Sequence, residues 1–278
     1  MTTSYDEWTD AQDSATVTVD DHDLEMAYRD EGTGEPVVFL HGIPTNSYLF
    51  RDQVAAVAAE RRVIAPDMVG YGNSAMHDGF DRSIRAQEIA VRDLVGQLGF
   101  DTVDFAGHDL GGGVGLRFAA RTPEAIDRLV LSNSVAYDSW PIPTITDLGL
   151  PETARESSVE EVQEMLDGLF RDTLLGDDHD EAFLDGMTAP WASEEGVTSV
   201  VRNASATNTS HTTEVDPRAV DADTLLLWGV EDEFQPVEWA ERLAEDIDST
   251  ELVRLDANHW VPRDRPEEFT DHLTEFLF

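Results

Sequence analysis

The 278-residue chain contains no cysteine and no lysine, so all 18 of its basic residues are arginine. Without cysteine, the chain can form no disulfide bond, no thiolate nucleophile and no Cys-ligated metal site. Its apolar runs are shorter than the roughly 20 residues that are needed to cross a bilayer. The acidic first residues lack the basic and apolar regions of a signal peptide. We therefore expect a cytoplasmic protein with no membrane partner.

Positive charge is scarce, because 58 acidic residues face 18 basic ones and leave a formal net charge of −40. Such a charge repels nucleic acids and anionic membranes, so we expect neither as a partner. The acidic residues are spread over the whole chain, which argues against a single binding patch. This composition resembles that of proteins from salt-in halophilic archaea, in which salt screens the repulsion between like charges. The alternative is an ordinary acidic protein from a mesophile.

Short β-rich runs alternate with helical patterns along most of the chain. The expected strands lie at residues 15–20, 24–29, 37–40, 62–65, 103–106, 128–132, 224–228 and 252–255. The expected helices lie at residues 48–59, 85–98, 110–121, 237–246 and 266–278. Strand, helix and strand at this spacing form βαβ units, whose strands are parallel. The sequence therefore predicts the α/β class, with a mostly parallel eight-stranded sheet and helices on both faces.

One long stretch, residues 136–217, contains helical patterns but no run that is typical of a strand. A helical subdomain inserted after the sixth strand explains this stretch. We expect it to form a cap, or lid, over a core made of residues 1–135 and 218–278. A chain of 278 residues fits one large domain with such an insertion.

A sharp turn follows the expected strand at 103–106 and reads Gly107-His108-Asp109-Leu110-Gly111. This sequence has the form of a nucleophile elbow, in which the central residue sits on a strained turn between a strand and a helix. Glycine is needed on both sides because side chains there would collide with the neighbouring strand and helix. The helix N-terminus favours an ionised carboxylate. The alternative, that Asp109 is only a helix N-cap, does not explain the flanking glycines.

Three further motifs accompany the elbow. They are Phe-Leu-His-Gly-Ile-Pro-Thr-Asn-Ser-Tyr at 39–48, Trp-Gly-Val-Glu-Asp at 228–232 and Asp-Ala-Asn-His-Trp-Val-Pro at 256–262. Together with the elbow they resemble the α/β-hydrolase superfamily. Within it they are similar to the branch of haloalkane dehalogenases and epoxide hydrolases, whose elbow carries Asp in place of Ser. The resemblance covers nearly the whole chain apart from the expected cap.

The resemblance implies a role for each matching residue. Asp109 would be the nucleophile, Asp232 the orienting acid and His259 the base, in the chain order of the family. Backbone N–H groups of Ile43 and Leu110 would form the oxyanion hole. A carboxylate is suited to displacing a leaving group from an sp³ carbon. The resulting alkyl ester would then be hydrolysed by a water molecule that His259 activates.

The position of the acid has an alternative. Some relatives place it after the preceding strand, where this chain has Asn133, Ser134 and, a little later, Asp138. Because the Asn133 side chain carries no charge, it cannot be the acid. This favours Asp232.

The chain has eight histidines, and two of them lie in the motifs in addition to His259. These two, His41 and His108, are expected to make orienting hydrogen bonds. The others lie outside the motifs and are expected to be solvated; they are His22, His77, His179, His211 and His272.

The chain departs from the dehalogenase pattern at the site for the departing halide. Relatives bind the halide with side-chain N–H donors, whereas this chain has Leu110 and Ile43 at those positions, and neither side chain donates. We expect substrate-binding or leaving-group-binding residues in or near the cap instead. They are Trp140, Tyr137, Trp191 and Asn133. For the two tryptophans, packing of the cap against the core is the alternative.

The sequence thus predicts a hydrolase that acts on small apolar organic molecules and is most similar to a haloalkane dehalogenase. An epoxide hydrolase, or another α/β-hydrolase with an Asp nucleophile, is the alternative. The pair of lid tyrosines that epoxide hydrolases share is absent, since Tyr137 alone lies in or beside the cap. A ligand-binding member of the fold without turnover is a second alternative. No phosphate loop or metal-ligand cluster appears, so we expect no cofactor and no metal. The identity of the substrate and the oligomeric state stay open.

Overall fold

The computed structural model describes residues 3–176 and 179–278, and its strands form one eight-stranded sheet. The spatial order is β1-β2-β4-β3-β5-β6-β7-β8. Only the β1–β2 and β2–β4 pairs are antiparallel. The bounds are Asp13–Val19 (β1), His22–Gly32 (β2), Pro36–Leu40 (β3), Arg62–Pro66 (β4), Val103–His108 (β5), Ile126–Ser132 (β6), Asp223–Gly229 (β7) and Thr250–Leu255 (β8). The predicted mostly parallel sheet of eight strands is therefore confirmed.

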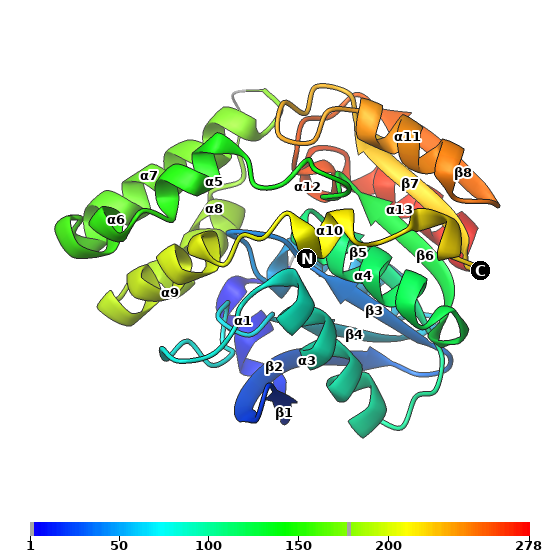
Figure 1. The fold of residues 1–278 in the computed structure, drawn as a ribbon, viewed down its shortest axis with the longest axis horizontal. Coiled ribbons are helices and arrows are strands. Elements are labelled where there is room, and N and C mark those ends of the chain that lie inside the picture. Colours follow the sequence, from blue (N-terminus) through cyan, green and yellow to red (C-terminus); the bar gives the residue numbers. More distant parts are fainter. Residues whose placement is uncertain (1–2, 177–178) are drawn as a thin grey trace.

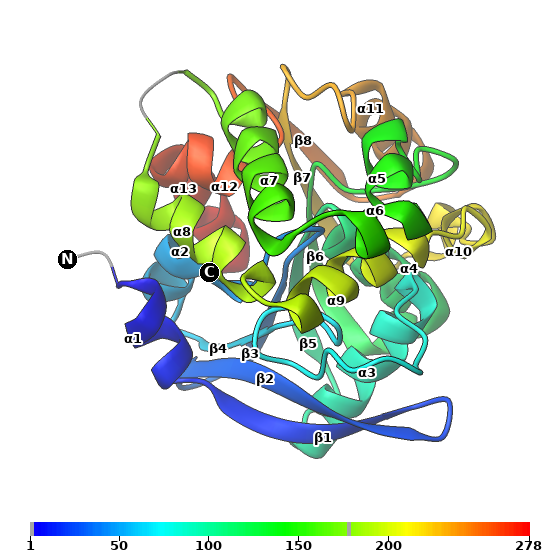
Figure 2. The ribbon, with the colours of Figure 1, turned by 90° about the vertical axis from the view of Figure 1, so that its left-hand side faces the viewer.

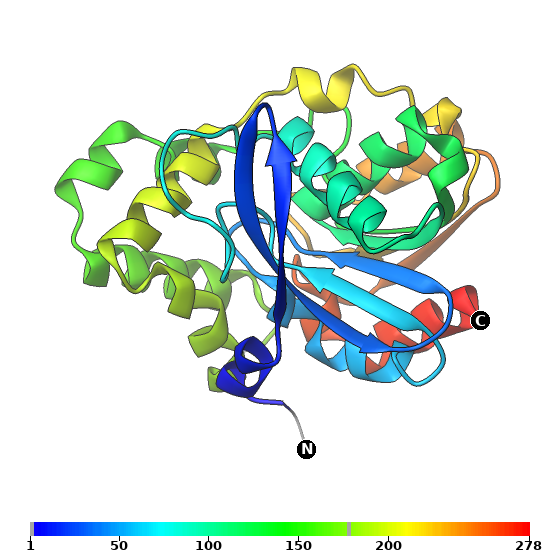
Figure 3. The ribbon, with the colours of Figure 1, turned by 90° about the horizontal axis from the view of Figure 1, so that it is seen from below.

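Helices cover both faces of the sheet, as predicted (Figure 3). Outside the stretch between β6 and β7, their bounds are Tyr5–Asp10 (α1), Arg51–Val57 (α2), Ile84–Gln97 (α3), Leu110–Arg121 (α4), Glu238–Asp246 (α11), Val261–Asp264 (α12) and Pro266–Leu277 (α13). On one face, α3 packs beside α4, which contacts β5 and β6, whereas α2 and α13 pack together on the other. In the described part of the chain, no helix combines the length and the apolar character needed to cross a membrane.

The strand that leads to the elbow lies deep in the core. β5 is flanked by β3 and β6, and all six of its residues are buried. A parallel strand covered by helices on both faces is apolar in nearly every position, which explains why Val103–Ala106 reads as a short buried run. The elbow therefore follows directly after a fully buried strand inside the sheet.

Two local expectations differ from the structure. The predicted helix at 48–59 is divided into a 3₁₀ turn, η1 (Ser47–Phe50), and the shorter α2. The cause is the side chain of Asn46, which accepts a hydrogen bond from the backbone N–H of Tyr48 and starts the tighter turn. The second difference is α1, a helix that is not among those predicted above, although Ser4 and Glu7 form a capping box at its start.

The chain between β6 and β7 forms helices and, in its described residues, no strand. We call residues 136–217 the cap segment; the boundaries of this subdomain stay a prediction. Its helices are Pro143–Leu148 (α5), Pro151–Glu156 (α6), Val159–Thr173 (α7), Glu181–Thr188 (α8), Glu194–Ser205 (α9) and Ser210–Thr213 (α10). Figures 1 and 2 show α5 to α9 gathered on one side of the sheet. Figure 2 views them face-on, with α7 and α9 in front of the strands.

The cap segment is held by apolar packing and by hydrogen bonds to the core. α7 begins with a capping box formed by Ser158 and Glu161 and buries Val162, Leu166 and Phe170 on one face. The indole N–H of Trp191, which lies in the 3₁₀ turn η3 (Ala189–Trp191), donates to the carbonyl oxygen of Pro44 at 3.0 Å. Because Pro44 belongs to the loop after β3, this bond fixes the cap segment against the edge of the sheet where β3 ends.

Candidate active site

Asp109 occupies a strained turn between β5 and α4. Its backbone has φ 53° and ψ −118°, a conformation that residues with a side chain seldom adopt. A Cβ atom at Gly107 would overlap the carbonyl oxygen of Gly111, and one at Gly111 would overlap that of Leu40. The Asp109 side chain makes no capping hydrogen bond to α4. Strain and flanking glycines without a cap contact favour a chemical role over a purely structural one.

The Asp109 carboxylate is buried, with 4% of the residue exposed, and it is held by backbone N–H groups. Ile43 donates its N–H to Oδ1 at 2.9 Å. The backbone N–H of Leu110 also lies near the carboxylate and helps to lower its pKa. A Cβ atom at Gly42 would overlap this carboxylate, so the loop after β3 approaches it closely. Burial raises the pKa of Asp109 to about 6, and the charge of His259 and the two N–H groups oppose this rise.

His259 lies between the two carboxylates that the sequence analysis selected. Its Nδ1 is 2.8 Å from Oδ2 of Asp232, and its Nε2 is 3.9 Å from Oδ2 of Asp109. Burial alone would lower the pKa of His259, but the charge of Asp232 and the hydrogen bond to it outweigh burial and raise that pKa. Burial would likewise raise the pKa of Asp232, yet its interactions with His259 and Asn133 hold it below the ordinary value. The structure thus brings all three expected catalytic residues together.

Asn133 holds the acid in place. Its Nδ2 donates to Oδ2 of Asp232, the same oxygen that faces His259, and its Oδ1 accepts the N–H of Gly229 at 3.0 Å. The N–H of Phe234 donates to the other oxygen of Asp232 at 2.7 Å. The role in substrate binding that was expected for Asn133 is therefore corrected, because both of its amide atoms are engaged by the acid and its strand.

A small cavity lies beside Asp109, with a volume of about 10 Å³, which is roughly the room for one water molecule. Apolar side chains from the cap segment and from the loops after β7 and β8 form most of its wall. The lining residues are Ile43, Asp109, Trp140, Ile142, Thr144, Ile145, Leu169, Phe234, His259 and Trp260. Of the expected cap residues, Trp140 lies in this wall.

Tyr137 and Trp191 do not lie in the cavity wall, so the role expected for them is corrected. The Tyr137 hydroxyl donates to Oδ2 of Asp246 at 2.8 Å, and the Arg242 guanidinium lies 3.6 Å from the centre of its ring. These contacts turn Tyr137 toward α11 and away from Asp109. The indole N–H of Trp191 donates to the carbonyl oxygen of Pro44, so Trp191 packs the cap segment against the core. Such packing was the alternative to substrate binding for this residue.

Two residues of the wall could have been found from their sequence positions. Trp260 directly follows His259 within the motif at 256–262, and Phe234 lies two residues beyond the end of the motif at 228–232. The residues of the wall that come from α5 and α7 carry no such signal. Their inward direction depends on how the cap segment packs.

The two other motif histidines behave differently from each other. Nε2 of His41 accepts the N–H of Met68 at 3.0 Å, which agrees with the expected orienting role. His108 is fully buried, and neither of its ring nitrogens has a hydrogen-bond partner in the described part of the chain. Its ring centre lies 4.9 Å from that of His259. The structure gives His108 no well-formed orienting hydrogen bond, and its contact with His259 is packing of the two rings.

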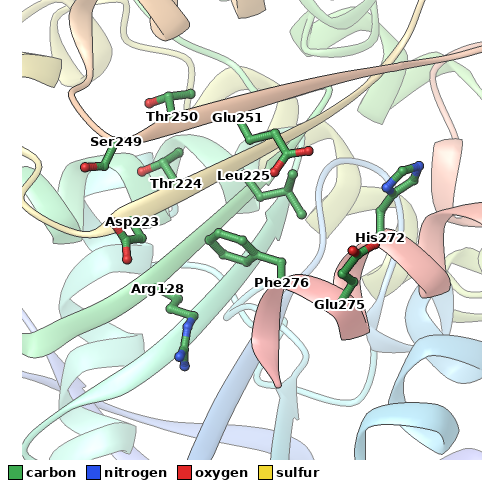
Figure 4. A pocket seen from close by; sticks show the side chains of 10 residues that line it. All are labelled: Arg128, Asp223, Thr224, Leu225, Ser249, Thr250, Glu251, His272, Glu275 and Phe276. Atoms are coloured by element: carbon green, nitrogen blue, oxygen red, sulfur yellow. The ribbon is translucent and has the colours of Figure 1, made fainter.

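A larger cavity of about 610 Å³ lies where β7 and β8 begin, at the edge of the sheet opposite to the elbow. Figure 4 shows the Arg128 side chain together with side chains of both strands and of α13 around it. No residue of the triad lines this cavity. Among the residues that the structure describes, no group of three or more His, Cys, Asp or Glu side chains is placed to hold a metal ion.

The geometry agrees with comparisons to known proteins. Residues 35–266 match the family described as "alpha/beta hydrolase fold". This chain belongs to the α/β-hydrolase family. The matched range contains every residue of the triad and of the oxyanion hole but not the β1–β2 hairpin.

Relatives of this α/β hydrolase include enzymes of two activities. The soluble epoxide hydrolase of Corynebacterium sp. strain C12 is 30% identical, over 91% of this chain and 93% of that protein. Haloalkane dehalogenase 2 of Mycobacterium tuberculosis is 29% identical, over 89% of this chain and 90% of that protein. Among solved structures, a thermophilic esterase from Thermogutta terrifontis superposes with a TM-score of 0.80 at 26% identity, covering 96% of this chain and 97% of the esterase. The chain is accordingly a hydrolase of this fold.

Proposed function

We propose that this α/β hydrolase uses Asp109 as a nucleophile and forms a covalent alkyl ester, as in a haloalkane dehalogenase. The observation that carries the proposal is the position of the carboxylate. Oδ1 accepts the N–H of Ile43, so Oδ2, which faces Nε2 of His259, is the oxygen that is free to attack. Attack of Oδ2 on an sp³ carbon forms the C–O bond, and the leaving group departs with its electron pair.

The second half of the reaction uses His259. A water molecule beside Nε2 loses a proton to the imidazole and attacks the carbonyl carbon of the Asp109 ester. The oxygen that becomes negative is Oδ1, which already accepts a hydrogen bond from the N–H of Ile43. The backbone N–H of Leu110 also faces the carboxylate and would add a second donor as the negative charge develops. Collapse of the tetrahedral intermediate releases the alcohol, which takes the proton from His259, and restores the carboxylate. Asp232, held ionised by His259 and by Asn133, stabilises the imidazolium.

The cavity wall supports a small uncharged substrate. Its side chains are mostly apolar, and no Arg side chain lines it. An anionic substrate would therefore lose its hydration without gaining a cationic partner. We infer a small neutral haloalkane as the best match to this wall.

The decisive test is a single turnover in ¹⁸O-labelled water containing molar KCl, with a pool of small bromoalkanes and epoxides. The ester mechanism places ¹⁸O in the carboxylate of Asp109, because water attacks the carbonyl carbon of the ester. Fragmentation of the peptide locates the label, and Asp104, which is buried in the preceding strand β5, serves as the internal control. Absence of label from every substrate, in protein shown to be folded, would favour a member of the fold without turnover.

Trp140 is the candidate donor to the leaving group. Two indoles line the cavity, and that of Trp260 donates to Oγ1 of Thr173, whereas that of Trp140 has no protein acceptor among the residues described. We expect Trp140→Phe to slow ester formation by about 10- to 100-fold, since a hydrogen bond to a charged group contributes about 1.5–3 kcal/mol. Hydrolysis of the ester should keep its rate, because no halide leaves in that step.

Rapid-quench kinetics with a bromoalkane measures the two rates of Trp140→Phe separately. Trp191→Phe is the matched control, because it also removes an indole N–H, but one that donates to Pro44. Equal slowing of both steps in Trp140→Phe would contradict a role at the leaving group.

An epoxide hydrolase is the second candidate, and one tyrosine favours it. Tyr71 is fully buried, and its hydroxyl has no hydrogen-bond partner among the described residues. Burial, followed by the charge of Asp109, raises the pKa of Tyr71, so the phenol stays protonated and available as a donor. Tyr71 is absent from the cavity wall, which keeps this candidate second. Formation of diol without bromide in the pooled experiment would select it.

We also propose that the protein is adapted to high salt. Carboxylates exceed arginines by 40, so most acidic side chains have no arginine of their own. Between about 0.1 M and 1 M KCl the Debye length falls from about 10 Å to about 3 Å, which screens their repulsion. We expect the unfolding midpoint to rise by about 10 °C or more over this range, since each kcal/mol shifts it by about 2–4 °C in a chain of this size. Thermal unfolding at stepwise KCl concentrations tests this, and full stability without salt would contradict it.

A further inference from the structure

One partly buried carboxylate beside the triad has no part in the mechanism described above. Asp264 ends the short helix α12 that follows His259. Its Oδ2 accepts the N–H of Asn258 at 2.8 Å, and its Oδ1 accepts the N–H of Leu175 at 2.9 Å. Asn258 directly precedes His259, whereas Leu175 follows α7 of the cap segment. A single side chain therefore joins the loop that carries the base to the end of a cap helix.

A second connection runs in parallel with the first. The indole N–H of Trp260, the residue after His259, donates to Oγ1 of Thr173 at 2.8 Å. Thr173 is the last residue of α7, and the Trp260 ring centre lies 4.5 Å from that of His259. The residues on both sides of the base are thus bound to the same end of α7.

The same part of α7 also closes the cavity. Leu169 lies in the cavity wall, and Phe170 packs on Trp260 with its ring centre 5.1 Å away. Since the cavity has room for only about one water molecule, a substrate enters only if the wall moves. Because hydrogen bonds join the end of α7 to Trp260 and, through Asp264, to Asn258, a displacement of this end would shift the residues on both sides of His259.

We propose that Asp264 is a positioning residue that couples α7 to His259, so that the base is aligned with Asp109 only when α7 closes the cavity. This inference rests on the proposed function for the role of His259. A carboxylate suits the task because each of its oxygens accepts one backbone N–H. Asparagine at this position offers only one acceptor oxygen and places an NH₂ group against the other N–H.

The variant Asp264→Asn tests the coupling. Amide hydrogen exchange is measured residue by residue. We expect the amide that then faces the NH₂ group, Leu175 or Asn258, to exchange at least about tenfold faster, as loss of a hydrogen bond to a charged acceptor predicts. The exchange rates of the backbone amides in β5 and β7 should not change. The matched control is Asp256→Asn. Asp256 lies three residues before His259, and its exposed carboxylate pairs with Arg265 and not with the cap segment. Slow exchange at both amides in Asp264→Asn would overturn the proposal.

Pre-steady-state kinetics separates positioning from general stability. Because His259 acts only in ester hydrolysis, Asp264→Asn should slow hydrolysis about tenfold, as the same lost bond predicts, and leave ester formation unchanged. The ester on Asp109 should then accumulate, as measured by mass spectrometry. Equal slowing of both steps, or no slowing of hydrolysis despite faster exchange, would overturn the proposal.

A second variant keeps the proposal testable if Asp264→Asn folds poorly. Thr173→Val removes the acceptor for Trp260 and leaves Asp264 intact, so it should also slow hydrolysis selectively. If wild-type protein forms no ester with any substrate, the proposed function fails, whereas the exchange measurement still decides whether Asp264 links α7 to the His259 loop.

Discussion

Replacement of Asp109 by asparagine should lower kcat by at least about 10⁴-fold, as removal of a catalytic nucleophile does in other hydrolases. The amide keeps the size of the carboxylate, and its oxygen can still accept the N–H of Ile43, so the elbow should retain its shape. The amide is, however, a far poorer nucleophile toward an sp³ carbon. Release of bromide or diol measures the loss of activity.

The same substitution should stabilise the fold above pH 6. Burial raises the pKa of Asp109 to about 6, so the ionised form is disfavoured in the folded state relative to the unfolded chain. For a carboxyl group with a raised pKa, stability is lost as pH rises from the ordinary value through about 6. Asp109→Asn does not lose stability in this way. The thermal unfolding midpoint of the variant minus that of the wild type should therefore increase as the pH rises from 4 to 7.

Asp104→Asn is the matched control for Asp109→Asn. Asp104 is buried on the same strand, and burial also raises its pKa to about 6, but it faces Arg61 and Arg128 at the other end of the strand. This variant should keep its turnover per folded molecule. Full activity of Asp109→Asn, or equal loss in both variants, would contradict the role of Asp109 as the nucleophile.

The sheet and the triad could be predicted because their signals are local. β5 appears as a short apolar run since helices cover both of its faces, and Gly107 and Gly111 mark the elbow because a side chain there would overlap the backbone. Parallel strands end at one edge of the sheet, so the loops after β5, β7 and β8 meet there. The order of the motifs then determines which Asp and which His face each other.

The cavity wall could not be predicted because it depends on side-chain direction within the cap segment. Tyr137 and Trp140 are three residues apart, yet one turns toward Asp246 and the other toward Asp109. Nothing in their sequence separates the two, since the choice depends on the packing of α11 and of α5. Asn133 shows the same limit. Its residue type excluded it as the acid, but only the fold shows that it binds the acid after β7.

His259→Gln should separate the two halves of the reaction. Ester formation needs only the ionised Asp109, whereas hydrolysis needs a neutral imidazole, so the variant should form one ester per molecule and then stop. Hydrolysis should slow by at least about 10³-fold, as loss of the base in a triad predicts. Mass spectrometry of the Asp109 peptide measures the added alkyl group. Absence of ester in the variant, with turnover in wild type, would place the nucleophile elsewhere.

The pH dependence of the wild type should show the same separation without a mutation. Ester formation rises as Asp109 ionises, with a midpoint near its pKa of about 6. Hydrolysis rises only as His259 loses its proton, and the charge of Asp232 raises the pKa of His259 above its ordinary value in spite of burial. Because hydrolysis has the higher midpoint, the fraction of enzyme held as ester should be highest at and below about pH 6 and should fall as the pH rises through the pKa of His259. An ester level that rises steadily with pH would contradict His259 as the base, because hydrolysis would then not depend on its deprotonation.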